Sequence, residues 1–249
     1  MPSGNSSSPI APTMDIKIIY EDNDILVIDK PAGIVVFPEG QTKENTLIDA
    51  LIEKYPELKN TGEQPRYGIV HRLDKDTSGV LLVAKNNESL IFLQKQFKNR
   101  EVGKKYVCLV EGTIKEDKGE IKSLIARSPK DGRKQKAYSE NGPHPKSARE
   151  AITEYRVLER FKDYTLLEVE IKTGRRHQIR CHFSYLHHPI AGDKLYCFKN
   201  SKIPKGLARQ FLHSAYLKIQ LPGEEIKEFE SGLPEELNNV LKNLQPSEQ

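Results

Sequence analysis

The stretch His71–Gly79 reads HRLDKDTSG and runs directly into the apolar segment Val80–Ala84, VLLVA. An apolar run of this length, rich in valine and leucine, predicts a buried β-strand. The polar stretch before it combines charges of both signs with a Thr-Ser-Gly turn. We therefore expect a loop held at the edge of a sheet. Asp74 lies in this loop beside two cations, Arg72 and Lys75, and nearby positive charge favours an ionised carboxylate.

The chemistry of Asp74 has two interpretations at this point. An ionised aspartate in a short loop can act as a covalent nucleophile or as a general base. An aspartate that caps a turn and forms a surface ion pair has the same local sequence. The loop by itself leaves both interpretations open.

A second polar stretch, Gly174–Arg180 (GRRHQIR), follows the alternating segment Thr165–Lys172. The alternation predicts a strand that ends near Gly174, and a helix is expected from about Arg176. Helical spacing would place Arg176 and Arg180 on one face. Two guanidinium groups there can bind a phosphate or orient a carboxylate, although a solvated basic face is the more ordinary interpretation.

The remaining patterns mix strands and helices irregularly. Strands are expected at residues 16–20, 25–29, 34–37, 106–110 and 215–221. Helices are expected from Asn45 or Thr46 to near Pro56, from about Glu88, and after Pro234 as the first helical residue. Residues 115–150 are polar and basic, with several glycines and prolines, and predict loops or weak hairpins. Without a sustained βαβ rhythm, the pattern favours an α+β fold in one domain over a doubly wound sheet.

Composition restricts the class of protein and its compartment. The chain has 249 residues with 37% hydrophobic and 30% charged residues, so a packed core is expected. No apolar run approaches the length of a membrane span, and residues 1–13 lack the apolar centre of a secretory signal. We expect these 13 residues to be a disordered leader. The cysteines, Cys108, Cys181 and Cys197, have no CxxC spacing, which favours a reducing, cytoplasmic location.

Positive charge is concentrated in one segment, although the net charge of the chain is only +4. Residues 127–136 carry five cations against one acid, and Arg133, Lys134 and Lys136 are among them. Such a patch attracts a polyanion, most plausibly a nucleic acid. A solvated surface loop is an equally ordinary interpretation of the charge alone.

Several familiar sites are absent from the sequence. There is no Walker A, GxGxxG, GxSxG or HExxH motif. Four histidines between residues 177 and 188 suggest a metal site, but His177 and His182 are five residues apart and would not share a helical face. Cys108 lies in an apolar segment, where thiols are usually inert. We therefore expect no bound metal and no cysteine nucleophile.

The polar stretches also carry a family resemblance. His71–Ala84 resembles the signature loop and strand of the RluA-type RNA pseudouridine synthases, and Gly174–Arg180 is similar to the second block of that family. His188–Asp193 (HPIAGD) is similar to its third block. The segment from Tyr20 to Gly33, and Lys105-Tyr106 at the start of a strand, match in the same order. Cys197 and His187 depart from the pattern where many relatives have glycine, which puts loop shape in doubt.

The resemblance implies both a fold and a reaction. The fold is a curved, mixed and mostly antiparallel sheet flanked by helices and loops, with an RNA-binding cleft. In the reaction, the uracil of a uridine in folded RNA is detached at N1, turned and rejoined through C5, without a cofactor or metal. By resemblance, 23S ribosomal RNA is the expected substrate and transfer RNA is the alternative. A catalytically silent RNA-binding or ribosome-assembly protein on the same fold is the alternative function.

The resemblance also assigns roles to individual residues. Asp74 matches the essential aspartate, and Tyr106 matches the aromatic residue beside the target base. Arg180 matches the arginine that pairs with the aspartate, and Arg72 a residue that fills the gap left by the extruded nucleotide. Phosphate contacts are expected from five further residues. These are Arg133, Lys134, Lys136, Arg175 and Arg176.

The domain expectation follows from the same comparison. Residues 14–249 are expected to form one catalytic domain. Many relatives carry a small S4-like RNA-binding domain at the N-terminus, and we expect none here because only 14 residues precede Asp15. A monomer is the favoured oligomeric state.

Overall fold

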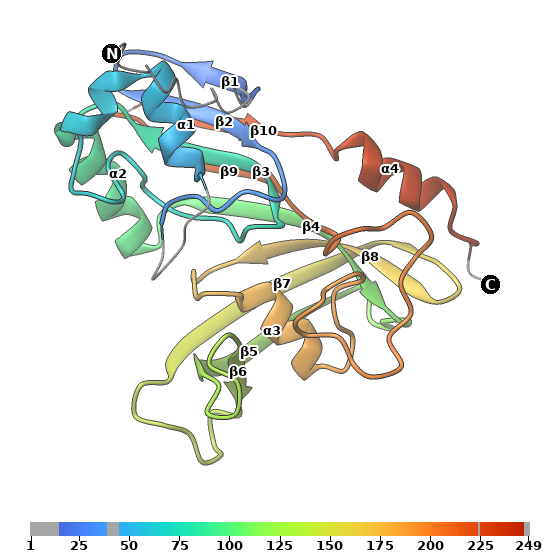
Figure 1. Ribbon diagram of the computed structural model, residues 1–249. Helices are drawn as coiled ribbons and strands as arrows, with labels where there is room; N and C mark the ends of the chain where they lie inside the picture. Colours follow the sequence, from blue (N-terminus) through green and yellow to red (C-terminus); the bar gives the residue numbers. More distant parts are fainter. Residues whose placement is uncertain (1–14, 39–44, 224, 247–249) are drawn as a thin grey trace, which may run out of the picture.

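One mixed sheet organises the molecule (Figure 1). The computed structural model describes residues 15–38, 45–223 and 225–246, so the predicted disordered leader lies outside the described residues. Ten strands in the described residues follow the order β1-β2-β3-β9-β4-β8-β7-β5-β6, and β10 pairs with β9. Every pairing is antiparallel except that of β3 with β9. The predicted α+β class, with a mixed and mostly antiparallel sheet, is confirmed.

The bounds of the elements are as follows. The strands are β1 (Lys17–Glu21), β2 (Ile25–Lys30), β3 (Ser78–Ala84), β4 (Gly103–Glu111), β5 (Lys118–Arg127), β6 (Gln135–Tyr138), β7 (Arg149–Arg160), β8 (Tyr164–Ile171), β9 (Leu212–Gln220) and β10 (Ile226–Glu230). The helices are α1 (Leu47–Lys54), α2 (Asn87–Asn99), α3 (Gln178–Tyr185) and α4 (Glu235–Lys242). Within the described residues, no helix is long and apolar enough to cross a membrane.

Strands β2 and β3 are buried on both faces, which explains why their sequences are continuously apolar. Alternate residues belong to different cores because side chains of a strand point to opposite faces. Leu26 and Leu81 pack in the core that includes helix α1, whereas Val27 and Leu82 pack in the core that includes α2. The two helices therefore cover opposite faces of this part of the sheet.

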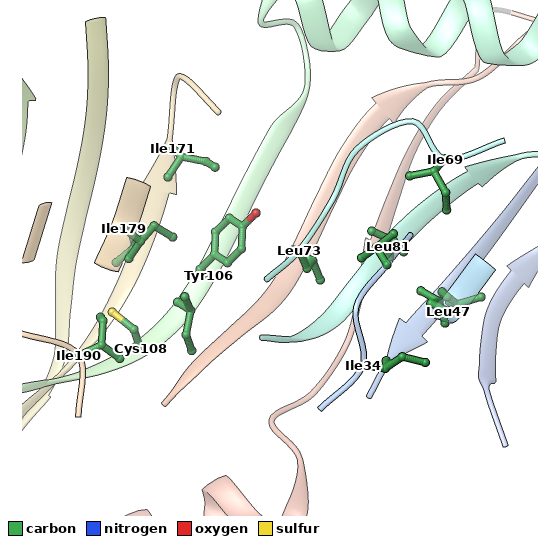
Figure 2. Close-up of a cluster of buried hydrophobic side chains, with 14 of the residues drawn as sticks. Ile34, Leu47, Ile69, Leu73, Leu81, Tyr106, Cys108, Ile171, Ile179 and Ile190 are labelled. Atoms are coloured by element: carbon green, nitrogen blue, oxygen red, sulfur yellow. The ribbon is translucent and has the colours of Figure 1, made fainter. Parts of the chain in front are cut away.

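The second half of the sheet supports helix α3. Tyr106, Cys108 and Val110 share one face of β4, as their spacing predicts, and belong to the core that contains Ile179 and Phe183 of α3. Figure 2 shows part of this core, with Tyr106 and Ile179 among the labelled side chains. Burying two large apolar side chains of α3 contributes a few kcal/mol, roughly 1.5–3 for each, and fixes the helix against the sheet.

The prediction of a strand at residues 34–37 is wrong. These residues form a loop whose carbonyl oxygens accept hydrogen bonds from the first turn of α1, at 2.8 Å from Leu47 N to Val35 O and 3.0 Å from Ile48 N to Val36 O. The loop thus satisfies amide groups that a helix N-terminus leaves without partners. Val36 is 1% exposed and Phe37 is 5% exposed, so their apolar character reflects burial and not strand pairing.

Residues 115–150, predicted as loops or weak hairpins, contain a β5/β6 hairpin and loops, but also a long strand that the prediction missed. Strand β5 takes up ten of these residues and pairs with both β6 and β7. Its buried residues alternate along the first part of the strand, with Ile121, Ser123 and Ile125 facing inward. The outward positions are charged, so the polar composition describes a strand with one solvated face. Strands β7 and β10 were not predicted at all.

Candidate active site

A cavity of about 540 Å³ opens beside strand β4, between the loop that precedes β3 and the segment that joins β8 to α3. The loop His71–Thr77 forms one wall, and residues 171–180 form another. The end of α2 and the start of β4 complete the lining. Asp74 and Tyr106 both line this cavity, so residues far apart in sequence are brought together at one site.

Asp74 is held by an arginine that also binds a second aspartate. Arg180 Nη1 donates to Asp74 Oδ2 at 2.8 Å, and Nε and Nη2 donate to the two carboxylate oxygens of Asp193 at 2.6 and 2.9 Å. The side chain of Asp74 is 18% exposed, whereas that of Asp193 is fully buried. Arg180 is therefore fixed from behind by Asp193 and presents Asp74 to the cavity.

The charge of Asp74 is set by opposing effects. Burial raises the pKa of this carboxyl. His177, which is protonated only at the low pH where the carboxyl titrates, and Arg180 more than offset the effect and hold the pKa below its usual value. For Arg180, burial opposes the charged form, but hydrogen bonds to Asp193 and the field of Asp74 raise its pKa further. Asp74 is thus an ionised acceptor at neutral pH.

Tyr106 provides a neutral hydroxyl beside this carboxylate. The residue is 6% exposed, and Figure 2 shows its ring with Leu73 of the loop on one side and Ile179 of α3 on the other. Burial raises the pKa of the phenol to about 12, which a hydrogen bond with Ser214 counteracts and the charge of Asp74 reinforces. The phenol therefore keeps its proton at neutral pH and can donate or relay it.

Comparison with known proteins identifies the family of the chain. The model of the RNA pseudouridylate synthase family matches residues 24–185, well over half of the chain. The chain belongs to this family. The match includes Asp74, Tyr106 and Arg180, and the predicted enzyme class, an isomerase, is confirmed for the family.

Relatives of the pseudouridine synthase extend the match beyond that segment. An uncharacterized RNA pseudouridine synthase of Aquifex aeolicus is 47% identical over 194 residues, which cover 77% of this chain and 59% of the relative. One of Bacillus subtilis is 39% identical over 246 residues, 98% of this chain and 78% of the relative. The ribosomal large subunit pseudouridine synthase D of Borreliella burgdorferi is 39% identical over 236 residues, 94% of this chain and 70% of the relative.

Solved structures of human proteins share the fold. Human RNA pseudouridylate synthase domain containing 1 has a TM-score of 0.76 and 27% identity, covering 96% of this chain and 92% of that one. Human RNA pseudouridylate synthase domain containing 4 has a TM-score of 0.73 and 27% identity, covering 93% and 95%. The pseudouridylate synthase fold therefore accounts for nearly the whole chain.

The loop that carries Asp74 is anchored by buried side chains that the sequence analysis did not single out. Lys30 is fully buried, and its Nζ donates to the carbonyl oxygens of Lys75 and Thr77 at 3.0 and 2.9 Å. Arg209 Nη1 donates to Asp76 O at 3.0 Å. Gly79 ends the loop with φ +113°, and a Cβ there would overlap the carbonyl oxygen of Ser214 on the parallel strand β9. These contacts hold the backbone around Asp74 in a single conformation.

The predicted pairing of Arg176 and Arg180 on one helical face is wrong. Helix α3 begins at Gln178. The residue before it, His177, has a left-handed backbone conformation with φ 55°. Arg176 therefore precedes the helix and is exposed, while Arg180 points to the two aspartates. The Asp193 partner could have been suspected from the HPIAGD block, but no local pattern links residues 180 and 193.

The cavity lining is strongly cationic. Nine lysine and arginine residues line it, and Asp74 is the only acidic residue among the described lining residues. Arg72, Arg175 and Arg176 belong to this lining, as their predicted RNA contacts require. The others are Arg66, Lys98, Arg100, Lys104, Lys172 and Arg180. Lys98, Arg100 and Lys104 were not predicted, because they lie in different elements and meet only in the fold.

The basic hairpin loop, defined here as residues 127–136 between β5 and β6, lies outside that lining. Arg133 is paired with Asp131 at 2.8 Å, and its side chain is 80% exposed. Lys134 Nζ lies 5.9 Å from the centre of the Tyr196 ring. Tyr196 in turn stacks on Arg180, 5.1 Å from the ring centre to Cζ, so the hairpin adjoins the site.

Arg72 has an aromatic support. Its guanidinium lies 5.1 Å from the centre of the Phe37 ring, and the guanidinium of Arg66 lies 4.9 Å from the same ring. Arginine groups stack on aromatic faces in this distance range. Arg72 thus stands at the cavity edge, beside Asp74, on a buried ring.

The histidines and cysteines form no metal centre in the described part of the chain. His182 is buried between the side chains of Ser123 and Thr153, at 2.9 and 2.8 Å. His71 accepts from the Leu82 amide at 3.0 Å and stacks on Phe97. These rings have structural partners, and the expected lack of a metal and of any cofactor stays a prediction. The three cysteines carry free thiols.

Proposed function

We propose that this chain isomerises specific uridines in structured RNA to pseudouridine, and that Asp74 takes the covalent part in that reaction. The observation that carries the proposal is the ionised Asp74, 2.8 Å from the buried Arg180 and open to a cationic cavity. Arg180 keeps the carboxylate charged and oriented. Tyr106 lies close enough to Asp74 for the carboxylate charge to raise the pKa of its phenol, and it supplies a protonated hydroxyl.

The charge of the cavity favours RNA as the substrate. Nine cations around one carboxylate attract a polyanion and repel cationic ligands. Phosphate contacts of this kind position a nucleic acid without reading its sequence. The cations on the walls are expected to hold the backbone while Asp74 on the floor meets the base or ribose.

The reaction requires the target nucleotide to leave its stack. Enzymes that act on a base extrude it at a cost of a few kcal/mol. A guanidinium inserted in its place stacks on the neighbouring bases and offsets part of that cost. Arg72, supported at the cavity edge by Phe37, is the residue that we assign to this role.

The names of relatives guide the choice of RNA. Proteins named ribosomal large subunit pseudouridine synthase D are about 40% identical over most of this chain. We therefore propose large-subunit ribosomal RNA as the substrate, with transfer RNA as the alternative. The free thiols of all three cysteines support a reducing location such as the cytoplasm.

The test follows the hydrogen at C5 of uracil, which is released when C5 bonds to the ribose. The wild type should release tritium from RNA labelled at uridine C5, and Asp74→Asn should abolish release while RNA binding is largely retained. Asp117→Asn, at a side chain that is 87% exposed, is the matched control and should leave the rate unchanged. Turnover by Asp74→Asn would dismiss the assigned carboxylate. Binding without any release by the wild type would favour the silent RNA-binding protein.

A further inference from the structure

Tyr196 lies between the basic hairpin loop and the catalytic pair. It is 5% exposed, and its hydroxyl oxygen accepts a hydrogen bond from the backbone amide of Gln135, the first residue of β6, at 2.7 Å. The same oxygen lies 3.1 Å from Nδ1 of His177. The Tyr196 and His177 rings meet edge to face, with centres 5.7 Å apart. Tyr196 therefore touches the hairpin and the site wall at once.

The donors and acceptors along this chain of contacts are consistent with one arrangement of the protons. A phenol has one proton to donate, and an amide N–H can only donate. Since the Gln135 amide gives its proton to the Tyr196 oxygen, the Tyr196 proton is free to be donated to His177 Nδ1. A neutral imidazole that accepts at Nδ1 carries its own proton on Nε2.

The Nε2 atom of His177 faces the catalytic carboxylate. It lies 3.8 Å from Asp74 Oδ1, while Arg180 holds the other oxygen, Oδ2, at 2.8 Å. Burial lowers the pKa of His177 to about 4, against the opposing field of Asp74, so the ring is neutral at pH 7. A distance of 3.8 Å is long for a hydrogen bond, and catalytic hydrogen bonds are often long before the substrate binds.

We propose that Tyr196 and His177 are positioning residues that form a hydrogen-bonded chain from the hairpin backbone to Asp74 Oδ1. The Tyr196 hydroxyl holds His177 in the Nε2–H tautomer, and Nε2–H directs one carboxylate oxygen while Arg180 directs the other. The inference rests on the proposed function, because it assigns Asp74 the reacting carboxylate. It also ties the RNA-facing hairpin to the site, since Lys134 lies against the Tyr196 ring.

The tautomer can be measured without any catalysis. Imidazole ¹⁵N NMR of the wild type should show His177 with an unprotonated Nδ1 and a protonated Nε2 at pH 7. Tyr196→Phe removes only the hydroxyl, and the His177 signals should shift toward a mixture of both tautomers. Tyr185→Phe removes a hydroxyl from a side chain at the end of α3 that is 44% exposed, and it should leave the signals unchanged. A wild type with Nδ1–H, or a Tyr196→Phe spectrum identical to the wild type, would overturn the inference.

Kinetics separate positioning from binding. Tyr196→Phe should lower kcat roughly fivefold to tenfold, the effect of one hydrogen bond, with KM within about twofold. His177→Asn, chosen because asparagine tolerates the left-handed backbone at φ 55°, should lower kcat by about tenfold or more. Both variants should keep the wild-type thermal midpoint within a few degrees. Wild-type kcat in both folded variants would overturn the proposal.

The two levels of the account fail in different ways. If Asp74→Asn retained turnover, the proposed function would be wrong whatever the tautomer of His177. If Asp74→Asn were inactive but Tyr196→Phe had wild-type kcat and an unchanged spectrum, only the positioning chain would fall.

Discussion

At the scale of single residues, Arg180 decides the chemistry of the site. It is a buried cation between two carboxylates, one exposed to the cavity and one fully buried. Buried charges are costly unless each is paired with good geometry, and removing one partner leaves the other uncompensated. The same group therefore determines both the charge of Asp74 and a share of the stability.

Replacing Arg180 by lysine tests this double role. A lysine keeps the charge but cannot form the forked contacts to Asp193 and still reach Asp74. We expect Arg180→Lys to lower the free energy of unfolding by about 3 kcal/mol, measured by urea denaturation. Arg156→Lys, at a side chain that is 63% exposed and paired with Glu168, should leave it near the wild-type value. An Arg180→Lys protein as stable as the wild type would show that the buried pairs contribute little.

The lowered pKa of Asp74 has a defined consequence for pH. Its folded pKa lies below the unfolded value of about 3.9, so the stability it contributes is present above that value and is lost as pH falls through the folded pKa. We expect the acid limb of the kcat profile that Asp74 controls to lie below about pH 4. In Arg180→Lys the limb should move to higher pH, because less positive charge near Asp74 would oppose the rise in its pKa that burial causes. Tritium release between pH 4 and 8 should therefore show no acid limb from Asp74 in the wild type and a fall at the acid end in Arg180→Lys. A variant without such a fall would contradict the pairing.

At the scale of elements, the catalytic loop is held by side chains from strand β2 and from the segment before β9. Lys30 ends β2 and donates to three carbonyl oxygens, including that of Pro31 at 2.9 Å. Gln210 Nε2 donates to Thr77 Oγ1 at 2.8 Å. The loop around Asp74 belongs to no strand, and the Lys30 donor, with the Gly33 amide at 2.9 Å from Lys75 O, satisfies buried carbonyl groups of its backbone.

Substituting Lys30 by methionine measures that anchoring. The methionine fills similar space but removes the Lys30 donor from the carbonyl oxygens of Pro31, Lys75 and Thr77, of which that of Lys75 keeps a second donor, the Gly33 amide. Unfolding should become easier by about 3 kcal/mol. The catalytic rate should fall as well, because the backbone on the C-terminal side of Asp74 is freed. Lys17→Met, on the neighbouring strand with a side chain that is 77% exposed, is the control. If both substitutions gave the same unfolding curve, the anchoring role would be refuted.

Sequence patterns predicted the strands correctly where the buried residues are also paired in the sheet. Val80–Ala84 and the alternation of Thr165–Lys172 were sufficient for β3 and β8, because periodicity reports the faces that are buried. Residues 34–37 are buried without being paired, so the same apolar signal predicted a strand that does not form. Lys30 and Arg209 act through backbone carbonyl groups remote in sequence, and no local pattern reveals such contacts.

At the scale of the whole molecule, the site forms only because the loop before β3, strand β4 and helix α3 come together in the fold. The family resemblance supplied Asp74, Tyr106 and Arg180, and the fold brings all three to one cavity. Helical spacing predicted that Arg180 and Arg176 share a face and gave no sign of Asp193. The left-handed backbone conformation of His177 makes the helix begin two residues later than predicted. The cationic walls also depend on tertiary structure, since Lys98, Arg100 and Lys104 come from α2, β4 and the turn between them.

The basic hairpin loop extends the cationic surface beyond the cavity. Neutralising Arg133, Lys134 and Lys136 to glutamine should weaken RNA binding and reduce the slope of log K against log salt by up to about 2. The control neutralises Lys115, Lys118 and Lys162, which are exposed at the opposite end of β5, and should leave the slope unchanged. Equal slopes for the wild type and the hairpin variant would show that this loop is only a solvated surface.

The most direct test of the central claim is a pseudouridine map of total RNA from a strain that lacks the gene. We predict that defined uridines in large-subunit ribosomal RNA lose their modification, and that the wild-type gene restores them whereas the Asp74→Asn gene does not. A map identical to that of the parent strain, or restoration by Asp74→Asn, would contradict the account.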